Sequence, residues 1–313
     1  MPDGVRGAES GRAGEGRLGM LLVFLSALAW SFGGMVARFV EVEDGWTMVF
    51  WRSVWASVFL LAYMLWRDGL RGTIELFRAM GLPGVAVSLC FTISSVAFVI
   101  ALGYTTVANI VLVQAGVPLF AALLAWIVFR ERVSGPTWGA IAAVIFGVGI
   151  MVSDSLGGSI SPIGDGLALT IAVALACATV ITRRFSDVRM TPATCLGTIV
   201  AACLAAAVAS ELAVPVGEMG WLFVFGALNL GLGLALFASG ARLVPAAWAA
   251  LLGTFEPLLA PVWVWLVHGE IPSSRTIIGG LVVMVALVAH LIIGFGRAQR
   301  PAKPGTTGVQ HPL

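Results

Sequence analysis

Ten long apolar runs are the feature that most restricts how this chain can fold. A helix that crosses about 30 Å of hydrocarbon needs roughly 20 apolar residues. The runs are Leu18–Ala37, Thr47–Trp66, Ala79–Leu102, Thr106–Phe129, Thr137–Ser153, Gly166–Thr182, Pro192–Ser210, Met219–Ala241, Val244–Val267 and Thr276–Gly296. The connectors between them are too short for a soluble domain. The sequence therefore predicts an all-α membrane protein with ten transmembrane helices.

The composition agrees with a membrane environment. Residues of the set AVILMFWYC make up 59% of the chain, charged residues make up 11%, and the mean hydropathy is +0.99. A soluble domain carries about 25% charged residues. Of the 34 Asp, Glu, Lys and Arg residues, all but Arg52 and Glu256 fall outside the ten runs. A net charge of +2 without a basic face predicts no nucleic-acid partner.

The basic residues predict the orientation of the chain. With ten helices, both termini and the even-numbered loops lie on one side of the membrane. That side carries 15 Lys and Arg residues, whereas the loops of the other side carry only Arg38 and Arg275. Basic residues concentrate in short cytoplasmic loops, so we expect both termini in the cytoplasm. The predicted parts are a cytoplasmic tail 1–17, a first five-helix repeat 18–153, an external linker 154–164, a second repeat 165–296 and a disordered cytoplasmic tail 297–313.

An internal repeat relates the fourth run to the ninth. When the chain is shifted by 139 residues, eight of 20 positions are identical between 118–137 and 257–276. The pairs that carry most weight are Pro118/Pro257, Glu131/Glu270, Ser134/Ser273 and Thr137/Thr276. The shift spans five helices, an odd number, so the second copy is predicted to lie upside down in the membrane. Glu131 is then cytoplasmic and Glu270 external.

Inverted repeats favour one class of membrane protein. Two copies of one fold in opposite orientation can exchange conformations, so that a pocket open to one side becomes open to the other. Many secondary transporters are built this way and bind their substrate near the membrane midplane between the repeats. A passive channel or an intramembrane enzyme has no such requirement. The repeat therefore favours a secondary transporter that works by alternating access.

Short motifs in a fixed order resemble those of a known family. The first run contains Ala29-Trp30-Ser31-Phe32-Gly33-Gly34 and the second contains Phe50-Trp51-Arg52. The fourth and ninth end in Phe129-Arg130-Glu131-Arg132 and His268-Gly269-Glu270-Ile271. Over residues 17–296 the chain resembles the EamA-type members of the drug/metabolite transporter superfamily. Two departures are that the seventh run has no counterpart of Arg52, and that Cys177 stands where the first run has Trp30.

The resemblance implies ten helices in two inverted repeats, and the export of amino acids, other metabolites or drugs. It further implies a multi-pass protein of the bacterial inner membrane. The expected partners are a small amino-acid-like substrate, the lipid bilayer and protons as a coupling ion. We expect no cofactor. The oligomeric state is left open, and a monomer is compatible with the sequence.

The two intramembrane charges are the first site candidates, because charge in the membrane interior costs free energy and usually has a function. Glu256 lies near the middle of the ninth run, and Pro257 leaves a backbone carbonyl without its helical donor. A buried carboxyl group favours its protonated form, which suits proton coupling. Arg52 either pairs with Glu256 or holds a substrate carboxylate through its planar fork. The alternative for both is a structural role in helix packing.

Uncharged polar and aromatic residues complete the predicted cavity. They are Trp30, Ser31, Ser94, Asn109, Gln114, Asn229, Trp248 and Thr254. Each also has a structural alternative, because intramembrane amides and hydroxyls commonly bond neighbouring helices or their own helix carbonyls. His290 lies near the end of its run, where an interfacial role is favoured.

No residue pattern points to a metal or to catalysis. Cys90, Cys177, Cys195 and Cys203 lie within runs and have no metal-binding spacing, so we expect no metal site. The chain contains no phosphate-binding loop for ATP and no HExxH or GxSxG motif. The leading interpretation is a non-enzymatic secondary transporter that exports neutral or aromatic amino acids with broad specificity. The alternatives are an exporter of drug-like or other metabolite cargo, an intramembrane enzyme and a passive channel.

Overall fold

All regular elements of the structure are helices. A computed structural model describes residues 3–130, 133–156, 161–185 and 187–298. The predicted disordered tail lies outside the described residues from position 299 on. The helices are α1 (Asp3–Ser31), α2 (Gly33–Ala37), α3 (Gly45–Ala79), α4 (Gly81–Ala101), α5 (Val107–Gln114), α6 (Val117–Phe129), α7 (Gly135–Leu156), α8 (Pro162–Arg184), α9 (Thr191–Val208), α10 (Val216–Phe223), the π-helix η1 (Val224–Leu232), α11 (Gly233–Gly240), α12 (Ala246–Gly253), α13 (Phe255–His268) and α14 (Ser274–Ala298).

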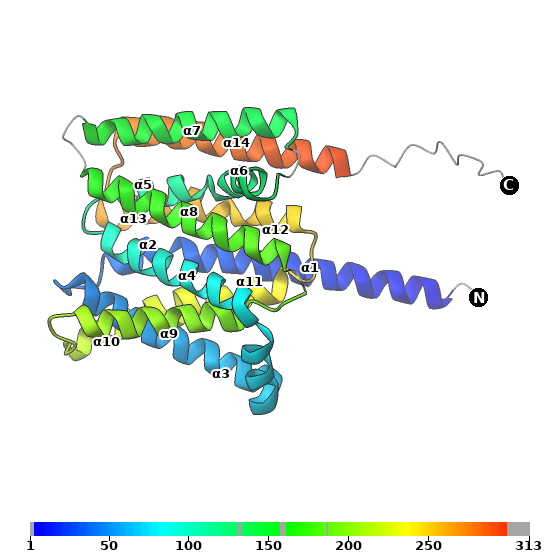
Figure 1. The fold of residues 1–313 in the computed structure, drawn as a ribbon, viewed down its shortest axis with the longest axis horizontal. Helices are drawn as coiled ribbons and strands as arrows, with labels where there is room; N and C mark the ends of the chain where they lie inside the picture. The colour runs from blue at the N-terminus through cyan, green and yellow to red at the C-terminus, as the bar shows by residue number, and fades with distance from the viewer. Residues whose placement is uncertain (1–2, 131–132, 157–160, 186, 299–313) are drawn as a thin grey trace.

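The described helices provide the number of membrane crossings that the sequence predicts. Nine helical segments are long and apolar enough to cross a membrane, and the pair α5–α6, bent by 43°, makes up to ten. The helices lie side by side, and both termini leave the bundle at the same end (Figure 1). We call this end the near end and the opposite one the far end. The charge distribution predicts that the near end is cytoplasmic.

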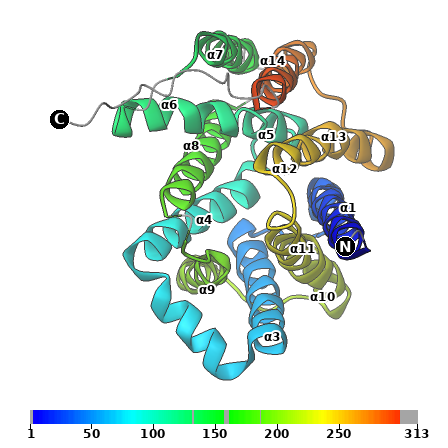
Figure 2. The same ribbon diagram turned by 90° about the vertical axis from the view of Figure 1, so that its right-hand side faces the viewer.

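One connector predicted from the sequence is helical instead. The second run was expected to end at Trp66, but α3 continues to Ala79. Gly69 interrupts it with φ 68° and ψ 176°, a left-handed conformation that glycine adopts without a Cβ clash. The segment after Gly69 runs across the near end of the bundle toward α4 (Figure 2). The chain therefore turns from the membrane normal into the plane of the membrane at this glycine.

The two repeats run in opposite directions. In Figure 1, α5 lies to the left of α6, whereas α13 lies to the left of α12, so the equivalent pairs α5–α6 and α12–α13 are antiparallel. Glu131 lies outside the described residues, but the end of α6 that precedes it is at the near end. Glu270 follows the end of α13 at the far end. The structure thus has the two-repeat architecture that the odd period predicted.

Equivalent glycine contacts fix the register between the repeats. A Cβ on Gly19 would meet Val244, and a Cβ on Gly164 would meet Thr105. Gly164 follows Gly19 by 145 residues, and Val244 follows Thr105 by 139 residues. The same contact therefore occurs once in each orientation. The offset of 145 places Leu175 opposite Trp30, which corrects the expected equivalence of Cys177 and Trp30.

The repeats pack through each other rather than as separate units. From the first repeat, α4 packs against α8 and α9, α3 against α9 and η1, and α1 against α11 and α13. The largest core cluster accordingly joins Val49 and Ile110 with Phe225 and Val264. Large apolar side chains on the outer surface, such as Leu82 and Leu281, are exposed, as expected of residues that face lipid.

A close crossing of the two repeats joins α7 and α14. A Cβ on Gly147 would lie 2.7 Å from the carbonyl oxygen of Gly279, so neither helix has room for a side chain there. Small residues allow helices to approach closely in membranes, where packing replaces the hydrophobic effect. This contact therefore holds the last helix of one repeat against the last helix of the other.

We predict that Gly147→Leu lowers the thermal unfolding midpoint in detergent by several degrees, because overpacking a tight contact costs about 1–3 kcal/mol. Gly149→Leu is the matched control. It makes the same change two residues away on α7, where a Cβ meets no atom within 4 Å. Equal midpoints for the two variants would contradict the assigned contact.

Candidate functional site

Two transmembrane helices are broken at equivalent positions. The first break lies at Ala115–Gly116, where α5 and α6 are bent by 43°. The second is a one-residue interruption at Thr254, between α12 and α13, where the backbone keeps helical φ and ψ angles. Thr254 follows Ala115 by 139 residues, the offset of the repeat. Pro118 and Pro257 stand near the start of the second half-helix in each case. Broken helices at such positions supply the substrate and ion sites of many inverted-repeat transporters.

Glu256 lies in the first turn of α13, directly after the second break. Its side chain is half-buried, and no hydrogen bond or ion pair within the described residues reaches its carboxylate. Phe255 packs edge-on against Phe24 of α1, with ring centroids 5.2 Å apart. A Cβ on Gly253, just before the break, would meet no atom within 4 Å. Open space therefore adjoins the break that carries the carboxylate.

Gln114 is the last residue of α5, directly before the first break. Its Nε2 is buried and has no hydrogen-bond partner among the described residues. At the repeat offset Gln114 corresponds to Gly253, so the two residues stand at equivalent edges of the two breaks. Buried polar groups in proteins are normally hydrogen-bonded. Gln114 therefore leaves an unpartnered amide donor at the edge of the first break, within the described residues.

Arg52 is buried among three helices, with only 6% of its surface exposed. Its Nη1 donates to Ser95 Oγ at 3.1 Å, and its Cζ lies 4.4 Å from the Phe225 ring and 5.3 Å from the Phe98 ring. Nε has no partner. Stacking on aromatic faces suits the delocalised guanidinium cation. At the repeat offset of 145, the second repeat has Gly197 in place of this arginine.

Arg52 does not form the ion pair with Glu256 that was one of its two expected roles. No carboxylate among the described residues pairs with its guanidinium. Depth along the membrane accounts for this. Arg52 lies seven residues from the far end of α3, about 10 Å, and Glu256 lies twelve residues from the far end of α13, about 18 Å. The two charges therefore serve different levels of the bundle.

Several other candidates form contacts between helices. Asn229, in η1, donates from Nδ2 to the carbonyl oxygens of Ala29 at 2.6 Å and Trp30 at 3.3 Å. Ser31 accepts from Trp263 Nε1 at 3.0 Å. These bonds join the break between α1 and α2 to the second repeat. The π-helix widens the turn that carries Asn229, and π-bulges frequently occur at functional sites.

The remaining candidates differ in their surroundings. Ser94 donates to Cys90 O and Thr254 to Leu251 O, within or beside their own helices. Trp30 Nε1 is buried and has no hydrogen-bond partner among the described residues. The side chain of Trp248 is exposed at the surface of the bundle. Of these four, only Trp30 therefore carries an unsatisfied polar group.

Asn109 pairs with a carboxylate that lies just outside the predicted run Gly166–Thr182. Its Nδ2 donates to Asp165 Oδ1 at 2.6 Å and to Thr105 Oγ1 at 3.1 Å. Asp165 is 3% exposed, because α8 begins at Pro162 rather than at Gly166. This bond links the fourth crossing of the first repeat to the first crossing of the second.

A polar cluster closes the far end, and sequence reasoning missed it. We call it the far-end closure; it consists of Arg38, Glu270 and three backbone groups. Arg38 lies 3.0 Å from Glu270 Oε2 through Nη2, and Nη1 donates to Leu102 O at 2.9 Å. Nη2 also donates to Thr105 O at 3.3 Å. Glu270 Oε1 accepts from Val107 N–H at 2.8 Å, at the start of α5.

The far-end closure joins the first and fourth crossings of the first repeat to the ninth crossing of the chain. A carboxylate at a helix N-terminus is favoured by the helix dipole, and the Arg38 guanidinium is satisfied by one carboxylate and two carbonyls. His268 Nε2 lies 3.0 Å from Met35 O one turn deeper. The only sequence signal was the Glu131/Glu270 match of the repeat.

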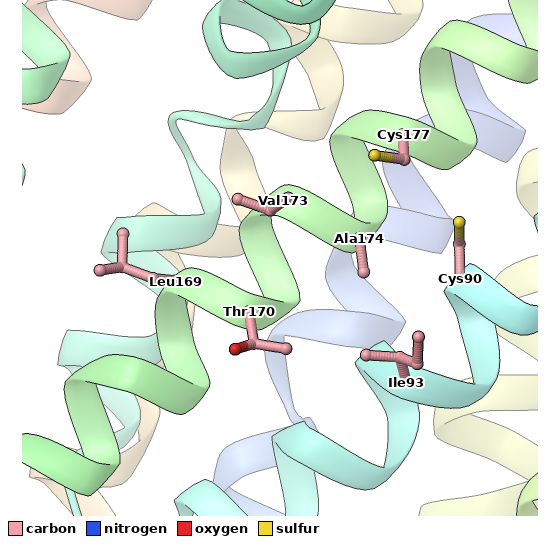
Figure 3. A pocket seen from close by; sticks show the side chains of 7 residues that line it. All are labelled: Cys90, Ile93, Leu169, Thr170, Val173, Ala174 and Cys177. Carbon is pink, nitrogen blue, oxygen red and sulfur yellow. The ribbon is translucent and has the colours of Figure 1, made fainter.

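A cavity of about 450 Å³ lies between α4 and α8, away from these residues. Figure 3 shows its lining, which is apolar apart from two thiols and one hydroxyl. The lining residues are Cys90, Ile93, Leu169, Thr170, Val173, Ala174 and Cys177. None of the predicted site residues contributes to it, and it offers no charge for a solute.

Comparison with known families decides the class of the protein. Residues 17–153 and 162–292 both match the EamA-like transporter family, one match for each repeat. The chain belongs to this family. An EamA-like protein is a membrane transporter of small solutes rather than an enzyme, and the family assignment confirms the resemblance seen in the sequence.

Solved structures support the fold of this EamA-like chain. Seventeen chains of solved structures match it. One of them, titled only as the crystal structure of a protein, has a TM-score of 0.63 and 18% sequence identity; the match covers 90% of this chain and 99% of that chain. At this identity the likeness shows the fold alone. No curated protein matches the EamA-like chain.

A double-mutant cycle tests the far-end closure. We predict that Arg38→Ala and Glu270→Ala each lower the thermal unfolding midpoint. The midpoint of the double variant should fall by less than the sum of the two single decreases. Direct partners couple by about 0.5–3 kcal/mol. Arg38→Ala combined with Glu43→Ala, an exposed acid with no bond to Arg38, is the additive control. Additive losses for Arg38 and Glu270 would contradict the pairing.

Proposed function

We propose that this EamA-like protein is a secondary transporter that exports small metabolites, with neutral and aromatic amino acids as its main cargo, by alternating access. The observation that carries the proposal is the pair of breaks at equivalent positions of two oppositely oriented repeats, one of which bears Glu256. A pocket at such breaks can open to either side when the repeats rock against each other.

The charges favour a cargo with a carboxylate. Arg52 is a buried cation with a free Nε and no carboxylate partner among the described residues. A guanidinium in this state is a natural receptor for a planar anion. The rings of Phe98 and Phe225 next to the guanidinium suit a cargo with an apolar or aromatic side chain. A cargo with several phosphates would require more cations than the membrane interior of this chain supplies.

Glu256 is assigned a separate role in proton coupling. The carboxylate is half-buried, has no ion-pair partner among the described residues, and lies next to open space at Gly253. Because it lies about 8 Å deeper than Arg52, one amino-acid backbone cannot contact both. Protonation and release at Glu256 during each cycle would link cargo export to the entry of protons.

The far-end closure is proposed as the contact that breaks when cargo is released outward. While Arg38 and Glu270 are paired, the ends of α2 and α13 are held together and the far end stays closed. Cargo then enters from the near end, which the basic loops predict to be cytoplasmic. The sequence has Arg183 at the position equivalent to Arg38, and Glu131, outside the described residues, at the position equivalent to Glu270.

Counterflow in proteoliposomes tests the function and the role of Arg52. Preloaded tryptophan should accelerate the uptake of labelled tryptophan, which a simple pore or an enzyme would not do. We predict that Arg52→Ala lowers the apparent affinity for tryptophan about tenfold or more, because a hydrogen bond to a charged group contributes about 1.5–3 kcal/mol. Tryptamine, which lacks the carboxylate, should be little affected. Ser95→Ala, which removes only the bond to Arg52, is the milder control.

Two results would reject this assignment. Equal loss for tryptophan and tryptamine would show that Arg52 acts through helix packing. The absence of counterflow for every amino acid tried, with the protein folded, would reject amino-acid export.

Glu256→Gln tests proton coupling without changing the shape of the side chain. We predict that uptake driven by a pH gradient falls to the level measured without a gradient, because the amide cannot bind and release a proton. Counterflow without a gradient should persist. The matched control is Gln114→Asn, which shortens the amide near the equivalent break and leaves Glu256 intact. Undiminished gradient-driven uptake by Glu256→Gln would exclude the carboxylate as the coupling group.

A further inference from the structure

Three arginines converge at the near end from segments far apart in the chain. Arg67 ends the membrane crossing of α3, Arg189 lies between α8 and α9, and Arg242 lies between α11 and α12. Burial and the nearby positive charges of Arg189 and Arg67 lower the pKa of Arg242. The first repeat thus supplies one member of the cluster and the second repeat supplies two.

The cluster carries more positive charge than its protein partners neutralise. Asp68 is the carboxylate that contacts it in the described part of the chain, and Arg189 takes both of its oxygens at 3.0 and 3.4 Å. Arg67 donates to Tyr63 OH at 2.9 Å, a neutral partner. Arg242 is exposed and has no hydrogen bond or ion pair to a described residue. Two cations therefore remain uncompensated.

The cluster also holds free donors in a fixed frame. Arg189 Nε is buried and has no hydrogen-bond partner among the residues that the structure describes. Tyr63 OH lies 2.7 Å from Ser239 Oγ, which joins α3 to α11 beneath Arg67. The bidentate pair with Asp68 fixes the loop of Arg189 against α3. Guanidinium groups held close together in this way match the oxygens of a phosphate.

The depth of the cluster is that of a lipid headgroup. Arg67 lies 22 residues after Gly45, where α3 begins at the far end, and this length spans about 33 Å of helix. Trp66, beside it, is 83% exposed, as in the aromatic belt of a membrane interface. After Gly69 the chain runs across the end of the bundle and exposes Leu70 and Ile74 (Figure 2). Apolar groups for acyl chains therefore flank the cations.

We propose that Arg67, Arg189 and Arg242 bind the phosphate of an anionic glycerophospholipid at the near-end surface of the membrane. Basic pockets between transmembrane helices on the cytoplasmic side are suited to such headgroups. The bound lipid would connect α3 of the first repeat with the α8–α9 and α11–α12 loops of the second. This site is independent of the cargo and of the proposed direction of transport.

Native mass spectrometry of the full chain with added lipid tests the site. Phosphatidylglycerol should bind the wild-type protein about tenfold or more tightly than it binds Arg67→Gln/Arg242→Gln, since each surface cation contributes to anionic-lipid affinity. The matched control is Arg71→Gln/Arg78→Gln, which removes two exposed arginines from the neighbouring segment and should retain the lipid. Phosphatidylcholine should bind weakly to all three proteins.

The other outcomes would overturn the proposal. Equal phosphatidylglycerol binding by the wild type and the cluster variant excludes the site, and equal losses in both variants show diffuse surface charge instead. Glycerol 3-phosphate that binds as tightly as the lipid shows a soluble-phosphate site. If Arg67→Gln/Arg242→Gln does not fold, Arg67→Lys/Arg242→Lys keeps the charges without the planar fork. This variant should bind phosphatidylglycerol more weakly than the wild type, and unchanged binding contradicts the guanidinium frame.

Discussion

The odd number of membrane crossings in each repeat is the constraint on which the rest of the structure depends. A backbone in hydrocarbon must satisfy its polar groups internally, so each crossing is a helix. After five crossings the chain lies on the opposite side of the membrane from where it started. A second copy of the same fold that begins there is therefore inverted. The paired contacts of Gly19 with Val244 and of Gly164 with Thr105 express this relation at the level of single residues.

The packing follows the repeat, whereas the charges depart from it. Arg52 corresponds to Gly197, and Glu256 corresponds to Val117, so each intramembrane charge occurs in one repeat only. In a symmetric scaffold the two repeats can exchange conformations, which gives two related states of the protein. Charges that occur in one repeat only give these two states different affinities for cargo and protons. The closely approaching glycines thus belong to the packing that both repeats share, whereas Glu256, at a break, belongs to the charges that only one repeat has.

The sequence predicts the membrane crossings well and the polar contacts poorly. Apolar length is a local property, so the ten runs and the inverted repeat can be found without a structure. The bond between Arg38 and Glu270 joins residues 232 positions apart, and no local pattern distinguishes these two from ordinary loop charges. Asp165 fell just outside its apolar run, because α8 begins at Pro162, four residues before that run. The turn at Gly69 depends on one backbone angle that composition does not reveal.

Accessibility at the break in α12–α13 tests alternating access most directly. Gly253→Cys, in a chain without its four native cysteines, can be exposed in proteoliposomes to a membrane-impermeant maleimide from one side at a time. Breaking the far-end closure with Glu270→Gln should raise the labelling rate from the far side and lower it from the near side, since the two openings exclude each other. Rates that rise on both sides, or that do not change, would contradict a pocket that opens to one side at a time.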